Sequence, residues 1–129
     1  MNNILEIKLI SEQKGKGLIA KKNIKKGKIV DIASIILLND EDYDLIKDTI
    51  LYGYIYEWDH PDETINNAIA LGICQFVNHS YQPNLKYEYD YEKELIIYLA
   101  IKDIPIGEEL TANYNGIVKD NSSLWFEVI

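Results

Sequence analysis

The sequence predicts a mostly β fold with one or two short helices. Apolar residues alternate with polar ones or form short β-branched runs, which is the pattern of strands rather than of long helices. Seven glycines lie between or beside these runs, where tight turns are expected. A chain of 129 residues has the length of one domain and buries roughly two thirds of its unfolded surface, enough for a core without metal or disulfide links. We therefore expect one domain over residues 1–129.

Strands are expected along most of the chain, separated by short turns. They cover residues 4–10, 18–20, 29–38, 52–58, 85–91 and 95–101. Lys26-Gly27 and Ile106-Gly107 predict two of the turns. The best helical candidate is the segment 40–51, because Asn39 or Asp40 can cap its start and acidic residues fill its first turn.

Charge is distributed unevenly along the chain, which has a formal net charge of −8. Residues 1–30 carry eight lysines and two glutamates, whereas the rest carries five lysines and nineteen acidic residues. An acidic body of this kind steers a cationic, lysine-rich partner toward a cleft and repels the phosphates of nucleic acid. We expect a basic protein or peptide as partner and no nucleic acid. A charged surface that only keeps the domain soluble is an equally good interpretation.

Cysteine and histidine are too few for a metal site or an internal disulfide. Cys74 is the single cysteine, and with only His60 and His79 it forms no zinc-ligand spacing. The start of the chain lacks the charged-then-apolar order of a signal peptide, and no apolar run approaches the roughly eighteen residues of a membrane span. We expect no metal, no membrane partner and a cytoplasmic protein, with secretion into a host cell as the alternative location.

Gly15-Lys16-Gly17 lies between two expected strands, where a glycine-rich backbone can turn sharply and present bare amides and carbonyls to a ligand. It is not a dinucleotide-binding fingerprint, because the third glycine, the following helix and the acidic residue about twenty positions on are absent. Taken alone, the segment is explained better as an ordinary β-turn.

Residues 78–84, with the sequence Asn-His-Ser-Tyr-Gln-Pro-Asn, gather amides, an imidazole and a hydroxyl in one compact loop after an apolar segment. Asn78 can donate and accept hydrogen bonds at once, His79 offers side-chain and backbone groups, and Pro83 restrains the turn. Such density suits a ligand pocket. A structural loop with a satisfied histidine is the alternative, since Asn and Ser are common turn formers.

A second polar block, residues 107–114, contains Glu108, Glu109 and Tyr114. The two carboxylates cannot work as one catalytic pair, because their neighbours mark the start of a strand, where adjacent side chains face opposite ways. The phenol of Tyr114 is more useful, since in a polar, water-poor site it can orient an amine and respond to developing charge through a fixed dipole. As one of ten tyrosines it is otherwise explained as a half-buried strand residue.

Three segments, GKGLIA at 15–20, NHSYQPN at 78–84 and GEELTANY at 107–114, resemble the signature of the SET-domain family in sequence, order and spacing. Members of this family transfer a methyl group from S-adenosylmethionine to the side-chain amine of a protein lysine. The resemblance covers nearly the whole chain and is to the small free-standing bacterial and viral type. It implies a single SET domain over residues 1–129, with short sheets in a β-clip arrangement and a pseudoknot-like crossing of the C-terminal motif near the second motif.

The same resemblance implies that the motifs build one site in a protein-lysine N-methyltransferase. The backbone around Lys16, Gly17 and Leu18 is expected to hold the methionine end of S-adenosylmethionine, and Asn78 and His79 are expected to hold the cofactor from the other motif. The remaining expected site residues are Tyr114 as the catalytic tyrosine that also contacts the cofactor, Tyr87 in the lysine channel, Phe76 through its backbone, and Trp125 with Phe126 over the adenine. A basic histone-like or ribosomal peptide is the expected substrate.

Several positions depart from the family pattern. Asn113 replaces the usual Asp before the catalytic tyrosine, Tyr81 replaces the usual Cys, and Gln75-Phe76-Val77 lacks the usual Arg. Some members carry a further channel tyrosine near Ala33, and its role here is either unfilled or supplied by Tyr52, Tyr54 or Tyr56. These departures leave open a degenerate SET domain that binds peptide or cofactor without turnover, and the resemblance also allows a homodimer. A β-rich interaction module unrelated to methylation is the third interpretation.

Overall fold

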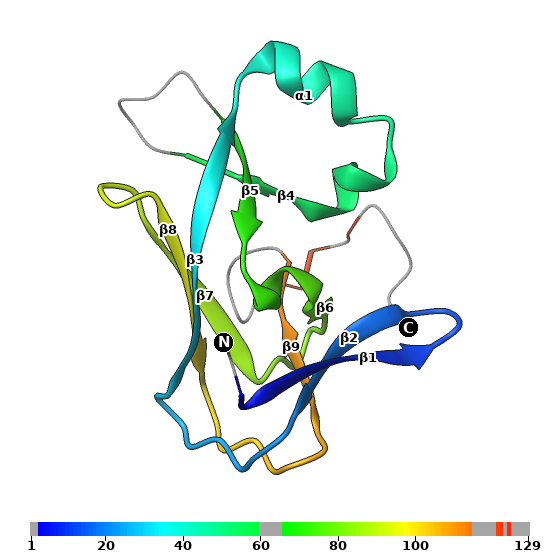
Figure 1. Cartoon of the computed structure of the whole chain (residues 1–129), viewed down its shortest axis with the longest axis vertical. Helices are drawn as coiled ribbons and strands as arrows, with labels where there is room; N and C mark the ends of the chain where they lie inside the picture. Colours follow the sequence, from blue (N-terminus) through cyan, green and yellow to red (C-terminus); the bar gives the residue numbers. More distant parts are fainter. Residues whose placement is uncertain (1–2, 60–65, 115–120, 123, 125–129) are drawn as a thin grey trace.

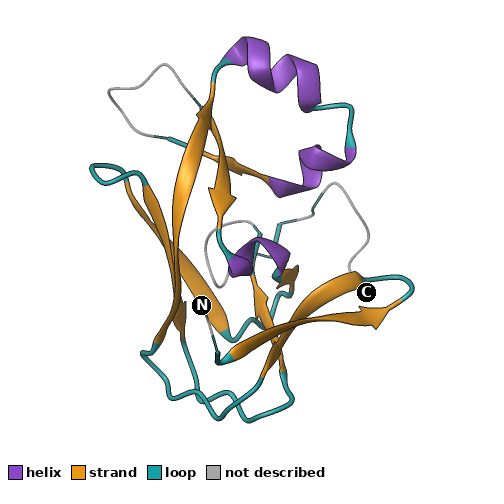
Figure 2. Cartoon of the chain, in the orientation of Figure 1, coloured by secondary structure: helices purple, strands orange, loops and turns teal. Residues whose placement is uncertain are grey.

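The computed structural model describes residues 3–59, 66–114, 121, 122 and 124. Within them the chain forms one four-stranded and one five-stranded β-sheet, with short helical segments between strands (Figure 1). Strands dominate the described chain, and helical turns are confined to three short stretches (Figure 2). This arrangement confirms the predicted mostly β fold.

The four-stranded sheet has the order β1–β2–β9–β6 and takes one strand from each of the three sequence motifs. Its strands are β1 (Leu5–Ser11), β2 (Gly15–Ala20), β6 (Asn78–His79) and β9 (Glu109–Ala112). β9 pairs antiparallel with β2 on one side and parallel with β6 on the other. In the parallel pair, Asn78 lies opposite Thr111 and His79 opposite Ala112. Motifs thirty residues apart in the chain therefore lie side by side, as the predicted crossing near the second motif requires.

The five-stranded sheet, of order β4–β5–β3–β8–β7, is antiparallel throughout. Its strands are β3 (Ile29–Leu38), β4 (Ile55–Glu57), β5 (Asn67–Leu71), β7 (Leu85–Asp90) and β8 (Leu95–Ala100). Tyr87 is opposite Tyr98, and Tyr56 is opposite Ala68. Paired residues point to the same face of a sheet, and Tyr98 and Ala68 are fully buried, so Tyr87 and Tyr56 project toward the core.

The helical segments are shorter than predicted. They are α1 (Asp40–Ile46), the 3₁₀ turn η1 (Ile50–Tyr54) and the 3₁₀ turn η2 (Ile73–Phe76). Asn39 caps α1 as expected, its side chain accepting a hydrogen bond of 2.8 Å from the N–H of Asp42.

Thr49 explains why the predicted helix over 40–51 and the predicted strand over 52–58 are both partly wrong. Its hydroxyl donates to the carbonyl of Ile46 at 2.6 Å and accepts from the N–H of Leu51 at 3.2 Å. A side chain that hydrogen-bonds to a carbonyl of one helical segment and to an N–H of the next ends the first segment and caps the second. The strand consequently begins only at Ile55.

The first motif also differs from its predicted local structure. Gly15-Lys16-Gly17 is the start of β2 rather than a turn, and the turn is formed by the three residues before it. Gly15 has a φ of +71°, the left-handed conformation that lets the chain enter the strand from this turn. The two predicted turns at Gly27 and Gly107 are confirmed, each glycine having a φ of +90°.

A common hydrophobic core joins the two sheets. Leu18 and Leu110 contribute fully buried side chains from the four-stranded sheet, and Leu85 and Ile96 contribute them from the other. Cys74 is buried in the same core as a free thiol. No helix in the described part of the chain is long and apolar enough to cross a membrane.

Candidate active site

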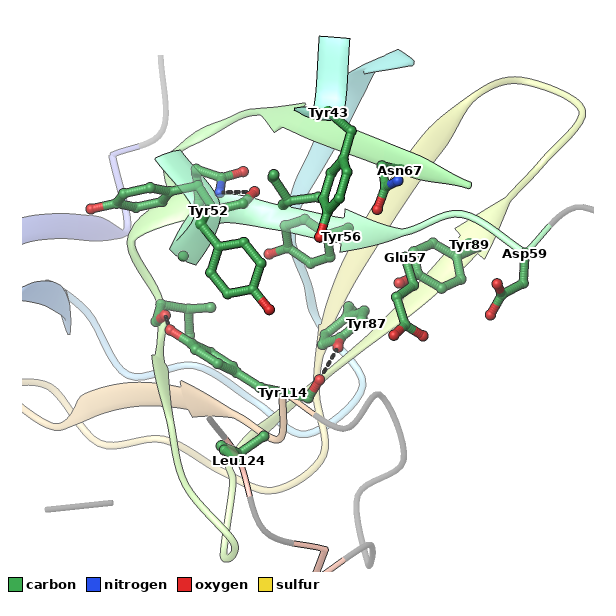
Figure 3. A pocket seen from close by; sticks show the side chains of 15 residues that line it. Tyr43, Tyr52, Tyr56, Glu57, Asp59, Asn67, Tyr87, Tyr89, Tyr114 and Leu124 are labelled. Carbon is green, nitrogen blue, oxygen red and sulfur yellow. Dashed lines mark hydrogen bonds between the residues drawn. The ribbon is translucent and has the colours of Figure 1, made fainter. Parts of the chain in front are cut away.

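A pocket of about 580 Å³ opens between β4, β7 and the end of β9 (Figure 3). Seven tyrosines line it, together with two carboxylates, and none of its described lining residues is a lysine. The lining residues are Tyr43, Tyr52, Gly53, Tyr54, Ile55, Tyr56, Glu57, Asp59, Asn67, Gln75, Val77, Tyr87, Tyr89, Tyr114 and Leu124. A cavity of this lining suits a long cationic side chain with an apolar stem better than it suits an anion.

Tyr114 connects this pocket to the second motif. It follows β9, and its ring lines the pocket while its hydroxyl donates to the carbonyl of Val77. Its backbone N–H donates to Nδ1 of His79 at 2.9 Å, and the two rings meet edge to face at 5.3 Å. The catalytic tyrosine expected from the resemblance is therefore held at two points by the residues flanking Asn78.

Tyr87, on β7, lies next to Tyr114 at the pocket (Figure 3). Its hydroxyl is 3.4 Å from the backbone carbonyl of Tyr114, to which it donates, and its ring meets that of Tyr56 edge to face at 5.5 Å. The hydroxyls of Tyr56 and Tyr98 are hydrogen-bonded to each other. Ala33 is fully buried and does not line the pocket, whereas Tyr56 does.

Burial controls the ionisation of these groups. Desolvation raises the pKa of Tyr114 and that of Tyr87 to about 12, and it raises the pKa of Tyr56 further. The phenols are therefore neutral at physiological pH. Desolvation also lowers the pKa of His79, which favours the neutral imidazole whose Nδ1 accepts the hydrogen bond from Tyr114.

The first motif meets the second beside this pocket. Pairing of β2 with β9 begins at Leu18, so the edge of β2 at Lys16 and Gly17 faces the Asn78 side chain instead of a strand. Asn78 Nδ2 donates to the carbonyl of Lys16 at 3.3 Å. A Cβ on Gly17 would lie only 2.6 Å from that nitrogen, so the close approach requires glycine.

Other expected site residues are placed as follows. Leu18 buries its side chain completely, which leaves only its backbone for a ligand. Phe76 closes η2 and packs edge to face on Tyr54, with ring centroids 6.4 Å apart. Trp125 and Phe126 lie outside the described residues.

Tyr81, where the family pattern has cysteine, connects the site to the C-terminal segment. Its hydroxyl donates to the carbonyl of Ser122 at 3.0 Å, and its ring meets that of His79 edge to face at 4.4 Å. Leu124, two residues after Ser122, lines the pocket. Among the described residues, no three His, Cys, Asp or Glu side chains are grouped as a metal site would require.

Sequence reasoning missed two side chains that organise the site. Asn84, which is 3% exposed, accepts from the N–H of Thr111 at 2.8 Å and donates to the carbonyl of Glu109 at 2.8 Å, so it holds β9 as a neighbouring strand would. Glu109 contacts Asn78 and Lys14. The available signals were an Asn directly after a proline and a second carboxylate in the third motif, but neither identifies a partner.

The β-rich fold, the adjoining motifs and the tyrosine-lined pocket define the class of protein. Residues 15–115 match the model of the SET domain, and the chain belongs to this family. It is 28% identical over 118 residues to a histone-lysine N-methyltransferase specific for H3 lysine 37 from Schizosaccharomyces pombe, a match that covers 91% of this chain and 74% of that protein.

Two further comparisons agree with the family. The chain is 31% identical over 125 residues to an H3 lysine-9-specific histone-lysine N-methyltransferase from Fusarium mangiferae, covering 78% of this chain but only 36% of that protein. Its fold resembles the crystal structure of a Plasmodium falciparum protein provisionally assigned as a histone methyltransferase, with a TM-score of 0.64, 22% identity, and 88% and 95% of the two chains covered. Family and relatives together support a protein-lysine methyltransferase.

Proposed function

We propose that the protein transfers a methyl group from S-adenosylmethionine to the side-chain amine of a lysine in a basic, histone-like protein. The position of Tyr114 supports this most directly, because the residue lines the pocket and is also hydrogen-bonded to the motif that is expected to hold the cofactor. In this proposal the lysine channel uses Tyr114 and Tyr87, and the cofactor is held by Lys16, Gly17, Leu18, Phe76, Asn78, His79, Tyr114 and Trp125.

The residues at the edge of β2 fit the amino-acid end of S-adenosylmethionine. Asn78 directs its Nδ2 at two acceptors, Lys16 O and Glu109 Oε2, so its Oδ1 is the atom that can accept from an ammonium group. The backbone at Lys16 and Gly17 has no partner strand on this edge within the described chain, which leaves peptide groups for the ligand. When bound, the cofactor supplies a methyl group on a positively charged sulfur.

The pocket supports the chemistry by holding the amine neutral and aligned. A free lysine has a pKa near 10.4, so neutralising it at pH 7 costs about 4.6 kcal/mol, from about 3.4 units at 1.36 kcal/mol each. A channel lined by neutral phenols lowers this cost because burial disfavours the ammonium form. Alignment of the two reactants supplies roughly 7–11 kcal/mol of the barrier reduction. Tyr114 and Tyr87 orient the amine, and no strong base is needed.

Carboxylates at the pocket support a basic substrate. Glu57 and Asp59 line one side of the pocket, whereas Tyr52 and Tyr114 line the other (Figure 3). The two acids can pair with cationic residues near the target lysine, and the acidic remainder of the chain increases the local concentration of such a peptide. The names of the two relatives make histone H3 the first substrate to test.

A transfer assay tests the proposal. The protein is incubated with radiolabelled S-adenosylmethionine and either core histones or histone H3 peptides in which single lysines are replaced by arginine. Label that disappears with one lysine supports the proposal. Cofactor binding without transfer to any of these substrates or to a lysate would support the degenerate SET domain instead, and neither binding nor transfer would refute both.

A further inference from the structure

Glu109, at the start of β9, holds two other parts of the chain at once. Its Oε1 is 2.8 Å from Lys14 Nζ in the turn between β1 and β2, and its Oε2 accepts from Asn78 Nδ2 on β6 at 2.8 Å. The side chains of Lys14 and Glu109 are only 24% and 18% exposed. Both carboxylate oxygens are therefore used in a partly buried place, where a hydrogen bond to a charged group is stronger than at the open surface.

This contact fixes the orientation of the Asn78 amide. The amide nitrogen lies between Glu109 Oε2 and the carbonyl of Lys16, and both are acceptors. Rotating the amide by half a turn would place its oxygen against them, which is repulsive. Glu109 thus determines that Asn78 presents Oδ1 rather than Nδ2 away from the strand.

Gly17 makes this arrangement sterically feasible. A Cβ at Gly17 would lie 2.6 Å from Asn78 Nδ2 and 2.8 Å from Glu109 Oε2, so these two polar groups pack directly on the bare backbone of β2. One residue from each of the three sequence motifs therefore takes part in a single contact, with Lys14 added from the preceding turn.

We propose that Glu109 is a positioning residue for the cofactor, which sets the Asn78 amide for its contact with the ammonium group of S-adenosylmethionine. This inference rests on the proposed function. Lys14 acts through Glu109 by restraining the carboxylate, and neither residue takes part in methyl transfer itself. An ion pair that only tied the hairpin to β9 would stabilise the fold without affecting the cofactor.

Calorimetric titration with S-adenosylmethionine, combined with thermal unfolding, separates these roles. Glu109→Gln keeps the shape of the side chain, but its amide N–H would face one of the two donors, Lys14 Nζ or Asn78 Nδ2. We therefore expect roughly ten-fold weaker cofactor binding. Lys14→Met removes one of two restraints on the carboxylate and should weaken binding roughly three-fold. Glu108→Gln is the matched control, since it makes the same charge change one residue away in an exposed residue. The glutamine oxygen can still accept the 3.4 Å contact from Asn84 Nδ2, so this variant should bind as the unmodified protein does.

The outcomes distinguish this inference from the proposed function. If the unmodified protein does not bind S-adenosylmethionine, the proposed function fails and the inference with it. If the unmodified protein binds the cofactor but Glu109→Gln binds it equally well, only the inference fails. The inference also fails if Lys14→Met weakens cofactor binding as much as Glu109→Gln does, because that result would indicate that the lysine touches the cofactor directly. Should Glu109→Gln not fold, unchanged binding by Lys14→Met would overturn the inference.

An Asn78→Ala background provides the final check. If Glu109 acts only through Asn78, Glu109→Gln should have no further effect on cofactor affinity once the amide is gone, and the peptide KM should change little in any variant. A full ten-fold additional loss in the Asn78→Ala background would contradict the positioning role.

Discussion

Replacing Gly17 by alanine tests the steric basis of the site. The new methyl group would lie 2.6 Å from Asn78 Nδ2, 2.7 Å from Ile10 Cγ1 and 2.8 Å from Glu109 Oε2, whereas ordinary contacts begin near 3.4 Å. Asn78 must therefore move by about 0.8 Å, the difference between 3.4 and 2.6 Å. Its hydrogen bond to the carbonyl of Lys16 is already 3.3 Å long and would be lost.

Two opposing terms determine the size of the effect on stability. Forcing a methyl group into a filled space costs about 1–3 kcal/mol. Alanine also restricts the unfolded chain more than glycine does, which offsets about 0.5–1 kcal/mol. We expect a net loss of about 0.5–2 kcal/mol in the free energy of unfolding, measured by urea denaturation. Cofactor affinity, measured by calorimetry, should fall roughly ten-fold because Asn78 is displaced.

Gly15→Ala is the matched control for this prediction. Gly15 has a φ of +71° and no atom within 4 Å of its missing Cβ, so alanine there introduces backbone strain of about 1–2 kcal/mol without a steric clash. It should lower stability but leave cofactor affinity unchanged. Wild-type affinity in Gly17→Ala, or an equal loss in both variants, would refute the reasoning.

The remaining predictions concern the pocket and its titrating groups. Tyr114→Phe removes only a hydroxyl and should keep cofactor binding while lowering kcat roughly hundred-fold; unchanged turnover would remove Tyr114 from the mechanism. Glu57→Gln with Asp59→Asn should raise KM for a basic peptide several-fold at low salt, an effect that vanishes near 1 M salt because the attraction is screened. Burial lowers the folded-state pKa of His79, so its contribution to stability is present above the unfolded value near 6.5 and is lost as pH falls toward the folded value. Urea unfolding between pH 7.5 and 5.5 should show this slope in the natural protein but not in His79→Gln.

Local features of the sequence predicted much of the fold. Strands at the positions of β3, β7 and β8 were predicted from apolar patterning, and the turns at Gly27 and Gly107 were predicted from turn chemistry. The two-residue β6 carries too few positions for any periodicity, so it could not be predicted. The helix boundary at Ile46 was missed because it depends on how Thr49 uses its hydroxyl, a choice that composition does not reveal.

The site shows the same limit. The polar residues of the three motifs could be selected because their chemistry is unusual for a strand or an ordinary turn, and the structure places Asn78, His79 and Tyr114 together. The two partners of Glu109 could not be identified from the sequence, because Asn78 is 31 positions away from it and Lys14 is 95 positions away. Glu57 and Asp59 belong to no motif, and only the placement of β4 beside the pocket gives them a role to test.

The position of β9 between β2 and β6 has a consequence for how the protein becomes active. β2 and β6 do not pair with each other in the described sheet, so the backbone pairing that joins the two walls of the proposed cofactor site runs through residues 109–112, with the hydrogen bond from Asn78 Nδ2 to the carbonyl of Lys16 beside it. Contacts of such long sequence separation form slowly, because the chain must first close large loops. During synthesis from the N-terminus, the hairpin of β1 and β2 and the sheet around β3 can form before β9, but the proposed site is completed only after β9 has emerged. Assembly of the proposed cofactor site thus coincides with the late docking of β9 between β2 and β6.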